Sequence, residues 1–220
     1  ENDGTYIYIS GQGSGEFTEA AADLTGKTVT VNGDTQLDTS RKQLGTASLL
    51  LDGSGDFLSL SGSSDFGFGT GDFTLEGFVY LNDTTGAQIL FDFRQSAIVE
   101  VSPVVYFNGT SLTYYVNNVA EITSTIAAAN WYHIAVVKSG TSTRMYVNGS
   151  QVGSTYTDTN DYGTTKPLVI GANLNSAAEL SGSIDEVRIS KGVARYTGAS
   201  FTVPTAEFTA DVNTSLLLHF

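Results

Sequence analysis

The chain of 220 residues contains no cysteine, only three prolines and few basic residues, and each shortage excludes a class of protein. Without cysteine there are no disulfides, zinc–thiolate sites or iron–sulfur clusters. Ten Lys plus Arg stand against 23 Asp plus Glu, which gives a formal net charge of -13. Nucleic acids and anionic membrane surfaces both require clustered basic side chains. We therefore expect no nucleic-acid partner and no attraction to such membranes.

Long apolar runs and helical patterns are also missing. The longest apolar runs, such as those at residues 48–51 and 216–218, are only the size of a strand. Both fall far short of the roughly 18 residues that a membrane-spanning helix needs. The sequence therefore predicts no membrane insertion.

The pattern that is present has a period of two, which is typical of half-buried strands. It is clearest at residues 73–81, 143–152 and 183–189, and Asn-Gly turns at 32–33, 108–109 and 148–149 separate such segments. About a dozen strands at regular spacing predict an all-β, two-sheet antiparallel sandwich or jelly roll. No shift in composition divides the chain, so residues 1–220 are predicted to form one domain. Residues 197–213 are expected to be an extended crossover toward a final strand.

Four segments, in this order and spacing, resemble one family: residues 47–60; 71–79; 130–138 with 145–152; and 170–172 with 182–190. The family is the concanavalin A-like, laminin-G-like (LamG) jelly roll, especially as found in phage and bacterial surface proteins. The resemblance implies the concanavalin A-like lectin/glucanase fold. It says little about the ligand, because lectins, glycanases and adhesion modules share this fold.

Two departures from the family pattern stand out. Gly77 occupies a position where the family usually has a large aromatic residue, so the strand is expected to bend or pack closely there. A copy of the usual family opening, Leu-Leu-Leu-His-Phe, lies instead at residues 216–220. Residues 214–220 are interpreted as a closing strand beside the N-terminal one, or alternatively as the start of a further repeat or a strand that pairs with another subunit.

Catalytic patterns are missing from the sequence. The family's glycanases resemble one another in a Glu-x-Asp-x-(x)-Glu strand, which this chain lacks, and there is no Gly-x-Ser-x-Gly or cysteine nucleophile. His133 lies in the strand motif of the family and is interpreted as structural, as is His219. Trp131, the one tryptophan, is assigned to the core. The sequence thus predicts a protein that is not an enzyme.

Calcium is the metal that the loops favour, because it binds carboxylate, amide and carbonyl oxygens. By resemblance, Asp52 and Asp185 are the expected calcium ligands, and the run containing Asp158 and Asp161 is a second candidate. The alternative is that these aspartates cap turns without any metal.

Carbohydrate binding requires an aromatic face together with amide and carboxylate groups. One loop offers this mixture in Tyr156, Asp158, Asn160 and Tyr162. A second patch offers it in Tyr115 and Asn117, beside Tyr114 and Asn118. The alternative is that these tyrosines pack against neighbouring strands.

Three functions follow from these features. The first is a non-catalytic carbohydrate-binding or adhesion module that recognises cell-surface glycan. The second is a self-associating structural subunit, such as a virion fibre, a capsid decoration or an extracellular filament, with homo-oligomers or tandem LamG repeats as partners. The third, a glycanase, lacks its motif. All place the chain outside the cell or on a virion surface.

Overall fold

The computed structural model describes residues 7–8, 21–22, 28–96 and 99–220, which fold into seventeen strands and one short 3-10 turn. The strands are β1 (Ile7–Tyr8), β2 (Ala21–Ala22), β3 (Thr28–Asn32), β4 (Gln36–Asp38), β5 (Ser48–Asp52), β6 (Phe57–Ser63), β7 (Phe73–Leu81), β8 (Ala87–Asp92), β9 (Val104–Asn108), β10 (Ser111–Val116), β11 (Val119–Thr125), β12 (Trp131–Ser139), β13 (Ser142–Val147), β14 (Ser150–Thr157), β15 (Lys166–Ile170), β16 (Ser181–Lys191) and β17 (Thr214–His219). The turn η1 (Ser64–Phe66) follows β6. No helix of the described residues has the length and hydrophobicity to cross a membrane.

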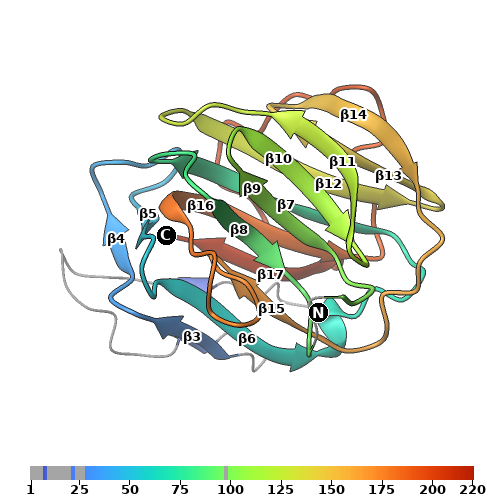
Figure 1. The fold of residues 1–220 in the computed structure, drawn as a ribbon, viewed down its shortest axis with the longest axis horizontal. Coiled ribbons are helices and arrows are strands. Elements are labelled where there is room, and N and C mark those ends of the chain that lie inside the picture. The colour runs from blue at the N-terminus through green and yellow to red at the C-terminus, as the bar shows by residue number, and fades with distance from the viewer. Residues whose placement is uncertain (1–6, 9–20, 23–27, 97–98) are drawn as a thin grey trace.

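The strands form two stacked sheets (Figure 1). The nine-stranded sheet has the order β1-β17-β16-β7-β12-β13-β14, with β5 paired to β16 and β4 paired to β5. The eight-stranded sheet has the order β11-β10-β9-β8-β15-β6-β3-β2. Neighbouring strands are antiparallel except β1 and β17, which are parallel. The predicted all-β, two-sheet concanavalin A-like sandwich is therefore confirmed.

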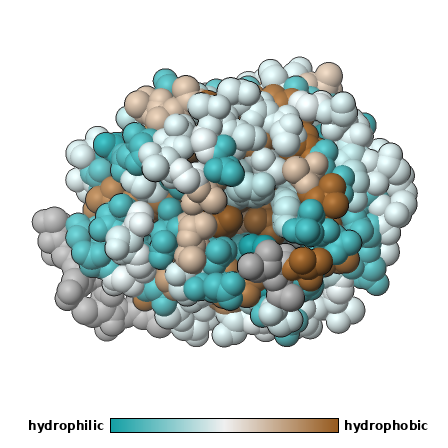
Figure 2. Space-filling model, in the orientation of Figure 1, coloured by the Kyte–Doolittle hydropathy of each residue, from teal (hydrophilic) through white to brown (hydrophobic). Residues whose placement is uncertain are grey.

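The core lies between the two sheets, because alternate side chains of each strand point inward. In β6, Leu58 and Leu60 are buried in this core, whereas Ser59 between them points to the outer face. On the face shown in Figure 2, many residues have intermediate hydropathy and appear white. This agrees with the low charged fraction of 15% and the abundance of Ser, Thr and Gly.

The centre of the nine-stranded sheet contains a bulge. The register of β16 against β7 shifts between Asp185 and Arg188, and Glu186 adopts a left-handed φ of 51°. Opposite the bulge, a Cβ on Gly77 would lie 3.4 Å from Val187 Cγ2. The predicted close packing at Gly77 is thus present, because the bulge occupies the space that a large aromatic side chain would need.

The predicted crossover is also present. Residues 192–213 form no named strand, run across the outer face of the nine-stranded sheet, and lead into β17. There, β17 pairs with β16 on one side and with β1 on the other. The C-terminal motif therefore makes its strand pairs within this chain and lies beside the N-terminal strand.

Candidate functional site

An open groove of about 290 Å³ lies on the outer face of the eight-stranded sheet, meaning the face that points away from the other sheet. Its floor comes from three neighbouring strands, because Ser59 of β6 pairs with Thr30 of β3 and with Val169 of β15. Its side walls come from the segments that follow β8 and β15. The lining residues are Thr30, Ser59, Leu60, Ser61, Arg94, Gln95, Pro167, Val169 and Leu174.

A buried ion pair fixes one wall of the groove. Asp92 is fully buried and accepts hydrogen bonds from Arg94 Nε at 2.9 Å and Nη2 at 2.6 Å. The same carboxylate accepts the backbone N–H groups of Arg94 at 2.9 Å and of Leu174 at 3.0 Å. Because a two-point guanidinium–carboxylate pair is geometrically strict, one aspartate holds both wall segments in place.

A second carboxylate stabilises the same wall from behind. Glu100 accepts the backbone N–H groups of Gln95 at 2.8 Å and Ser96 at 3.2 Å, and it forms an ion pair with Lys166 of β15. Burial raises the pKa of Glu100, but the hydrogen bonds from Lys166, Gln95 and Ser96 outweigh it and hold the pKa at about 2. The wall therefore stays anchored across the physiological pH range.

The lining of the groove combines apolar surface with neutral polar groups. Pro167, Val169 and Leu174 offer apolar surface for C–H groups, and the hydroxyls of Thr30, Ser59 and Ser61 and the amide of Gln95 offer polar groups for sugar hydroxyls. The charge of Arg94 is balanced by Asp92. The nine lining residues include no carboxylate, histidine or cysteine, so the groove wall supplies no acid–base pair.

The structure corrects the sugar-binding loop predicted around Tyr162. Tyr162 is fully buried, and its hydroxyl donates to Asp158 Oδ2 at 2.7 Å and lies 3.0 Å from the hydroxyl of Tyr114. Asp158 is also fully buried and accepts from Thr143 Oγ1 at 2.7 Å. Neither side chain can contact a sugar, because both are buried in the core, where Thr143 and Tyr162 donate hydrogen bonds to the carboxylate of Asp158.

The rest of that loop remains at the surface, but its polar side chains are hydrogen-bonded to one another. Asn160 Nδ2 donates to the hydroxyl of Tyr156 at 2.8 Å and to Asp158 Oδ1 at 3.0 Å. Both Tyr156 and Asn160 are half-buried. With Tyr162 buried, the alternative of cross-strand packing describes this loop better than a binding platform does.

The second predicted patch lies elsewhere on the eight-stranded sheet. Tyr115 on β10 is half-buried, donates its hydroxyl to Asn118 Oδ1 at 2.5 Å, and packs edge-on against Tyr106. Asn117 is exposed in the turn between β10 and β11 with a left-handed φ of 48°. In sheet order, β8 and β9 separate this patch from β15, so it is not part of the groove.

The structure does not bring the predicted calcium ligands Asp52 and Asp185 together. Asp52 pairs with Ser181 at the exposed end of β5, and Asp185 lies four residues further along β16, which is about 13 Å for an extended strand. Asp185 is buried, and its Oδ2 accepts the backbone N–H groups of Gln43 and Leu44 at 2.9 Å each. It anchors the loop at residues 39–47 instead of facing a metal.

Asp52 instead lies with Asp34 and Asp56, whose carboxylates come within 4.8 Å of one another. Asp56 is buried and accepts the backbone N–H groups of Asp34 at 2.9 Å and Asp52 at 3.0 Å. Asp52 in turn accepts from Ser54 N at 2.7 Å. These are the bonds of the turn-capping alternative. Calcium binding stays a prediction, and titration of EDTA-stripped protein that gives neither heat nor a melting shift would exclude it.

The second candidate metal site, Asp158 with Asp161, is not supported either. Both oxygens of Asp158 accept hydrogen bonds within the core and the loop. Asp161 is exposed and accepts Gly163 N at 2.8 Å, which is a local turn.

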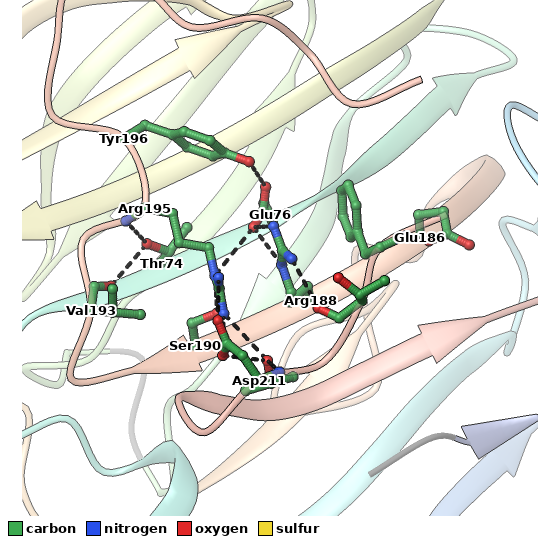
Figure 3. A network of polar contacts seen from close by, with 12 residues as sticks. Thr74, Glu76, Glu186, Arg188, Ser190, Val193, Arg195, Tyr196 and Asp211 are labelled. Carbon is green, nitrogen blue, oxygen red and sulfur yellow. Dashed lines mark hydrogen bonds and ion pairs between the residues drawn. The ribbon is translucent and has the colours of Figure 1, made fainter. Parts of the chain in front are cut away.

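A buried polar network that the sequence did not indicate lies under the crossover (Figure 3). Glu76 of β7 is fully buried and accepts from Arg188 Nε at 2.8 Å and from the hydroxyl of Tyr196 at 2.8 Å. Arg195 forms a paired contact with Asp211, at 2.9 Å and 2.8 Å. The network ties residues 195–211 to the sheet.

Both histidines lie beside this network in structural positions, as expected. His133 is buried against the ring of Phe78, and its Nε2 lies 3.3 Å from Glu76 Oε2 without hydrogen-bond geometry. His219 Nδ1 lies 2.6 Å from Glu186 Oε1, and Glu186 Oε2 accepts Phe208 N at 2.6 Å. Glu76 and Glu186 both accept hydrogen bonds from residues of the crossover, Tyr196 and Phe208, and so anchor it to the sheet.

Comparison with protein families identifies the fold class. The concanavalin A-like lectin/glucanases superfamily matches residues 52–195. The chain belongs to this superfamily. No curated protein matches the chain.

Solved structures show the same fold at low identity. Domain 4 of AbnA, a GH43 extracellular arabinanase from Geobacillus stearothermophilus, in complex with arabinotriose, matches with a TM-score of 0.58 and 17% identity, covering 79% of this chain and 87% of that one. The receptor binding domain of botulinum neurotoxin mosaic serotype C/D matches with a TM-score of 0.54 and 12% identity, covering 81% of this chain. The present chain covers only 46% of the length of that toxin domain.

Proposed function

We propose that this superfamily member is a non-catalytic carbohydrate-binding module and that the groove on the eight-stranded sheet holds the glycan. The observation that carries the proposal is the groove itself: a lining that mixes apolar side chains with hydroxyl and amide groups, and a wall fixed by Asp92 and Glu100. A rigid wall limits the entropy lost on binding. The arabinotriose-bound relative supports a sugar as the ligand class.

The proposal includes a location outside the cell, which the extracellular arabinanase relative supports. It includes no catalytic step, because the groove lining contains no carboxylate, histidine or cysteine that could act as an acid or base or activate a hydroxyl. Individual sites of this type bind weakly, so repeated copies would supply useful affinity. No contact within the described residues favours the self-associating virion or filament subunit, which stays a prediction that analytical ultracentrifugation tests.

Calorimetric titration with arabinotriose and with xylo- and gluco-oligosaccharides tests the groove. Val169→Asp places a charge on the apolar floor, and Gln95→Ala removes an exposed amide from the wall. We expect Val169→Asp to abolish binding in the groove and Gln95→Ala to weaken binding there about tenfold, the effect of one lost hydrogen bond.

Val119→Asp is the matched control, because Val119 is a 50% exposed valine on β11 of the same sheet. It should bind like the unmodified protein. Circular dichroism and melting show whether each variant is folded. If folded Val169→Asp binds every active sugar with the same affinity and the same stoichiometry as Val119→Asp does, the groove is not the site.

A further inference from the structure

Trp131 is not in the core, contrary to the prediction from the sequence. It begins β12, is half-buried, and lies on the outer face of the nine-stranded sheet beside Tyr80, its register partner in β7. The rings of Trp131 and Tyr80 meet edge to face, with centroids 5.7 Å apart and planes at 61°. A half-exposed indole at the end of a sheet is an aromatic surface that no described side chain fully covers.

Polar groups are already assembled beside these rings. The guanidinium of Arg41 lies over Tyr80, with Cζ 4.4 Å from the ring centroid. Arg41 Nη1 donates to Asn82 Oδ1 at 2.6 Å, and Asn82 Nδ2 donates to Ser181 Oγ at 3.3 Å. The cation–aromatic contact and the two hydrogen bonds hold Arg41 and Asn82 in one arrangement before any ligand arrives.

The aromatic surface is also rigidly backed. Trp131 packs, with Leu44 and Val203, against the buried cluster of Phe78, Phe208 and Leu217. Leu44 comes from the loop that Asp185 anchors, and residues 203–208 come from the crossover that Glu186 anchors. The indole is therefore held by packing on one side and remains partly exposed.

From this geometry we infer a second glycan-binding surface on the face opposite the groove, made by Trp131, Tyr80, Arg41 and Asn82. The inference rests on the proposed carbohydrate-binding function and adds a site to it. The indole would contact the C–H face of a sugar ring, and Arg41 and Asn82 would bond its hydroxyls.

The ligand class is a neutral sugar and not a polyanion. Arg41 carries the positive charge of this surface. The carboxylate of Asp38 lies nearby, and its Oδ1 accepts the backbone N–H of Arg41 at 3.2 Å. The whole chain carries a formal charge of -13, which repels anionic ligands at long range. Two neutral-sugar surfaces on opposite sheets would let one module bridge two glycan chains.

The single tryptophan gives a direct test. Because the chain has one Trp, intrinsic tryptophan fluorescence reports on this surface and not on the groove. We expect arabinotriose, or one of the xylo- or gluco-oligosaccharides, to produce a saturable change in Trp131 fluorescence that is insensitive to salt. Arg41→Ala and Asn82→Ala keep the fluorophore and should each weaken that change about tenfold or more.

Groove variants separate this inference from the proposed function. Folded Val169→Asp should lose the calorimetric site in the groove and keep the fluorescence titration, so stoichiometry falls from two to one. Asp83→Ala is the control, because Asp83 is an exposed neighbour of Asn82 whose carboxylate accepts the backbone N–H of Thr85 at 2.7 Å. If sugars bind by calorimetry but leave Trp131 fluorescence unchanged, the second surface is refuted and the groove stands. If the fluorescence change disappears with Val169→Asp, the two surfaces are not independent and the inference also fails.

Discussion

The substitution Glu76→Ala should destabilise the fold more than any exposed acidic substitution. The carboxylate is fully buried, and it accepts hydrogen bonds from Arg188 and from Tyr196. Removing it leaves the Arg188 guanidinium, which is only 10% exposed, without its buried partner. Breaking one side of a buried ion pair costs about 3–5 kcal/mol.

The structure also predicts how that loss divides among the partners of Glu76. Arg195 keeps its paired contact with Asp211, so the cost falls chiefly on Arg188 and Tyr196. Tyr196→Phe removes one hydrogen bond to a charged group and should cost about 1.5–3 kcal/mol. Because both changes remove the same hydrogen bond, the double variant should be less destabilised than the sum of the two.

Equilibrium urea unfolding, followed by circular dichroism, measures these free energies of unfolding. Glu207→Ala is the matched control, because Glu207 is exposed and its loss should change stability by less than about 0.5 kcal/mol. A loss below about 1 kcal/mol for Glu76→Ala would show that the network does not hold the crossover.

The pH dependence of this contribution has a definite sign. Burial raises the pKa of Glu76, but contact with His133 and the charge of Arg188 outweigh burial and lower it below its ordinary value. A carboxyl whose folded pKa is depressed stabilises the fold above its unfolded pKa of about 4.3. The difference between the unmodified protein and Glu76→Ala should therefore shrink as pH falls below about 4.

Three further predictions concern other buried positions. Burial raises the pKa of Asp185 to about 6, so the contribution of Asp185 to stability should fall by about 3 kcal/mol as pH rises from about 4 to 6 and beyond. In urea unfolding, Asp185→Asn should therefore be more stable relative to the unmodified protein at pH 8 than at pH 4. An equal difference in stability at both pH values would refute this. Tyr162→Phe loses a buried hydrogen bond to a carboxylate and should cost about 1.5–3 kcal/mol in urea without changing sugar affinity, whereas a loss of sugar binding in the folded variant would restore the loop as a site. A Cβ on Gly182 would lie 1.9 Å from the carbonyl oxygen of Tyr80, so Gly182→Ala should lower the free energy of unfolding, measured by thermal melting, by about 1–3 kcal/mol or more. A Cβ on Gly62 would lie 3.5 Å from Thr165 Cγ2, so the control Gly62→Ala should be tolerated.

The architecture was predictable because strand signals are local. Period-two alternation places residues 73–81 in β7 with the predicted bounds, and the predicted segment at residues 183–189 lies inside β16. The predicted strand at residues 143–152 is split into β13 and β14, because the Asn148–Gly149 turn interrupts it. Asn148 has a left-handed φ of 49° there, which such a turn requires.

The candidate site was not predictable because it depends on the register of strands distant in sequence. Ser59, Thr30 and Val169 become neighbours only through the pairing of β6 with β3 and β15. Register also separates Asp52 from Asp185, which family resemblance had placed together. Composition likewise could not distinguish a tyrosine that enters the core, such as Tyr162, from one that stays half-buried, such as Tyr156.

The acidic composition has a different meaning in the structure from the one that the sequence indicated. Six carboxylates among the described residues are buried, and five of them accept backbone N–H groups of loops: Asp56, Asp92, Asp158, Asp185 and Glu186. The sixth, Glu76, holds the crossover through side chains. A chain with no cysteine and three prolines has no disulfides and few rigid turns to order its loops. Buried carboxylates take that role, because hydrogen bonds to a charged acceptor are about twice as strong as neutral ones. Three of these carboxylates, Asp92, Asp185 and Glu186, therefore order the loops around the two proposed sugar surfaces, and acidic composition does not by itself mark a site for calcium.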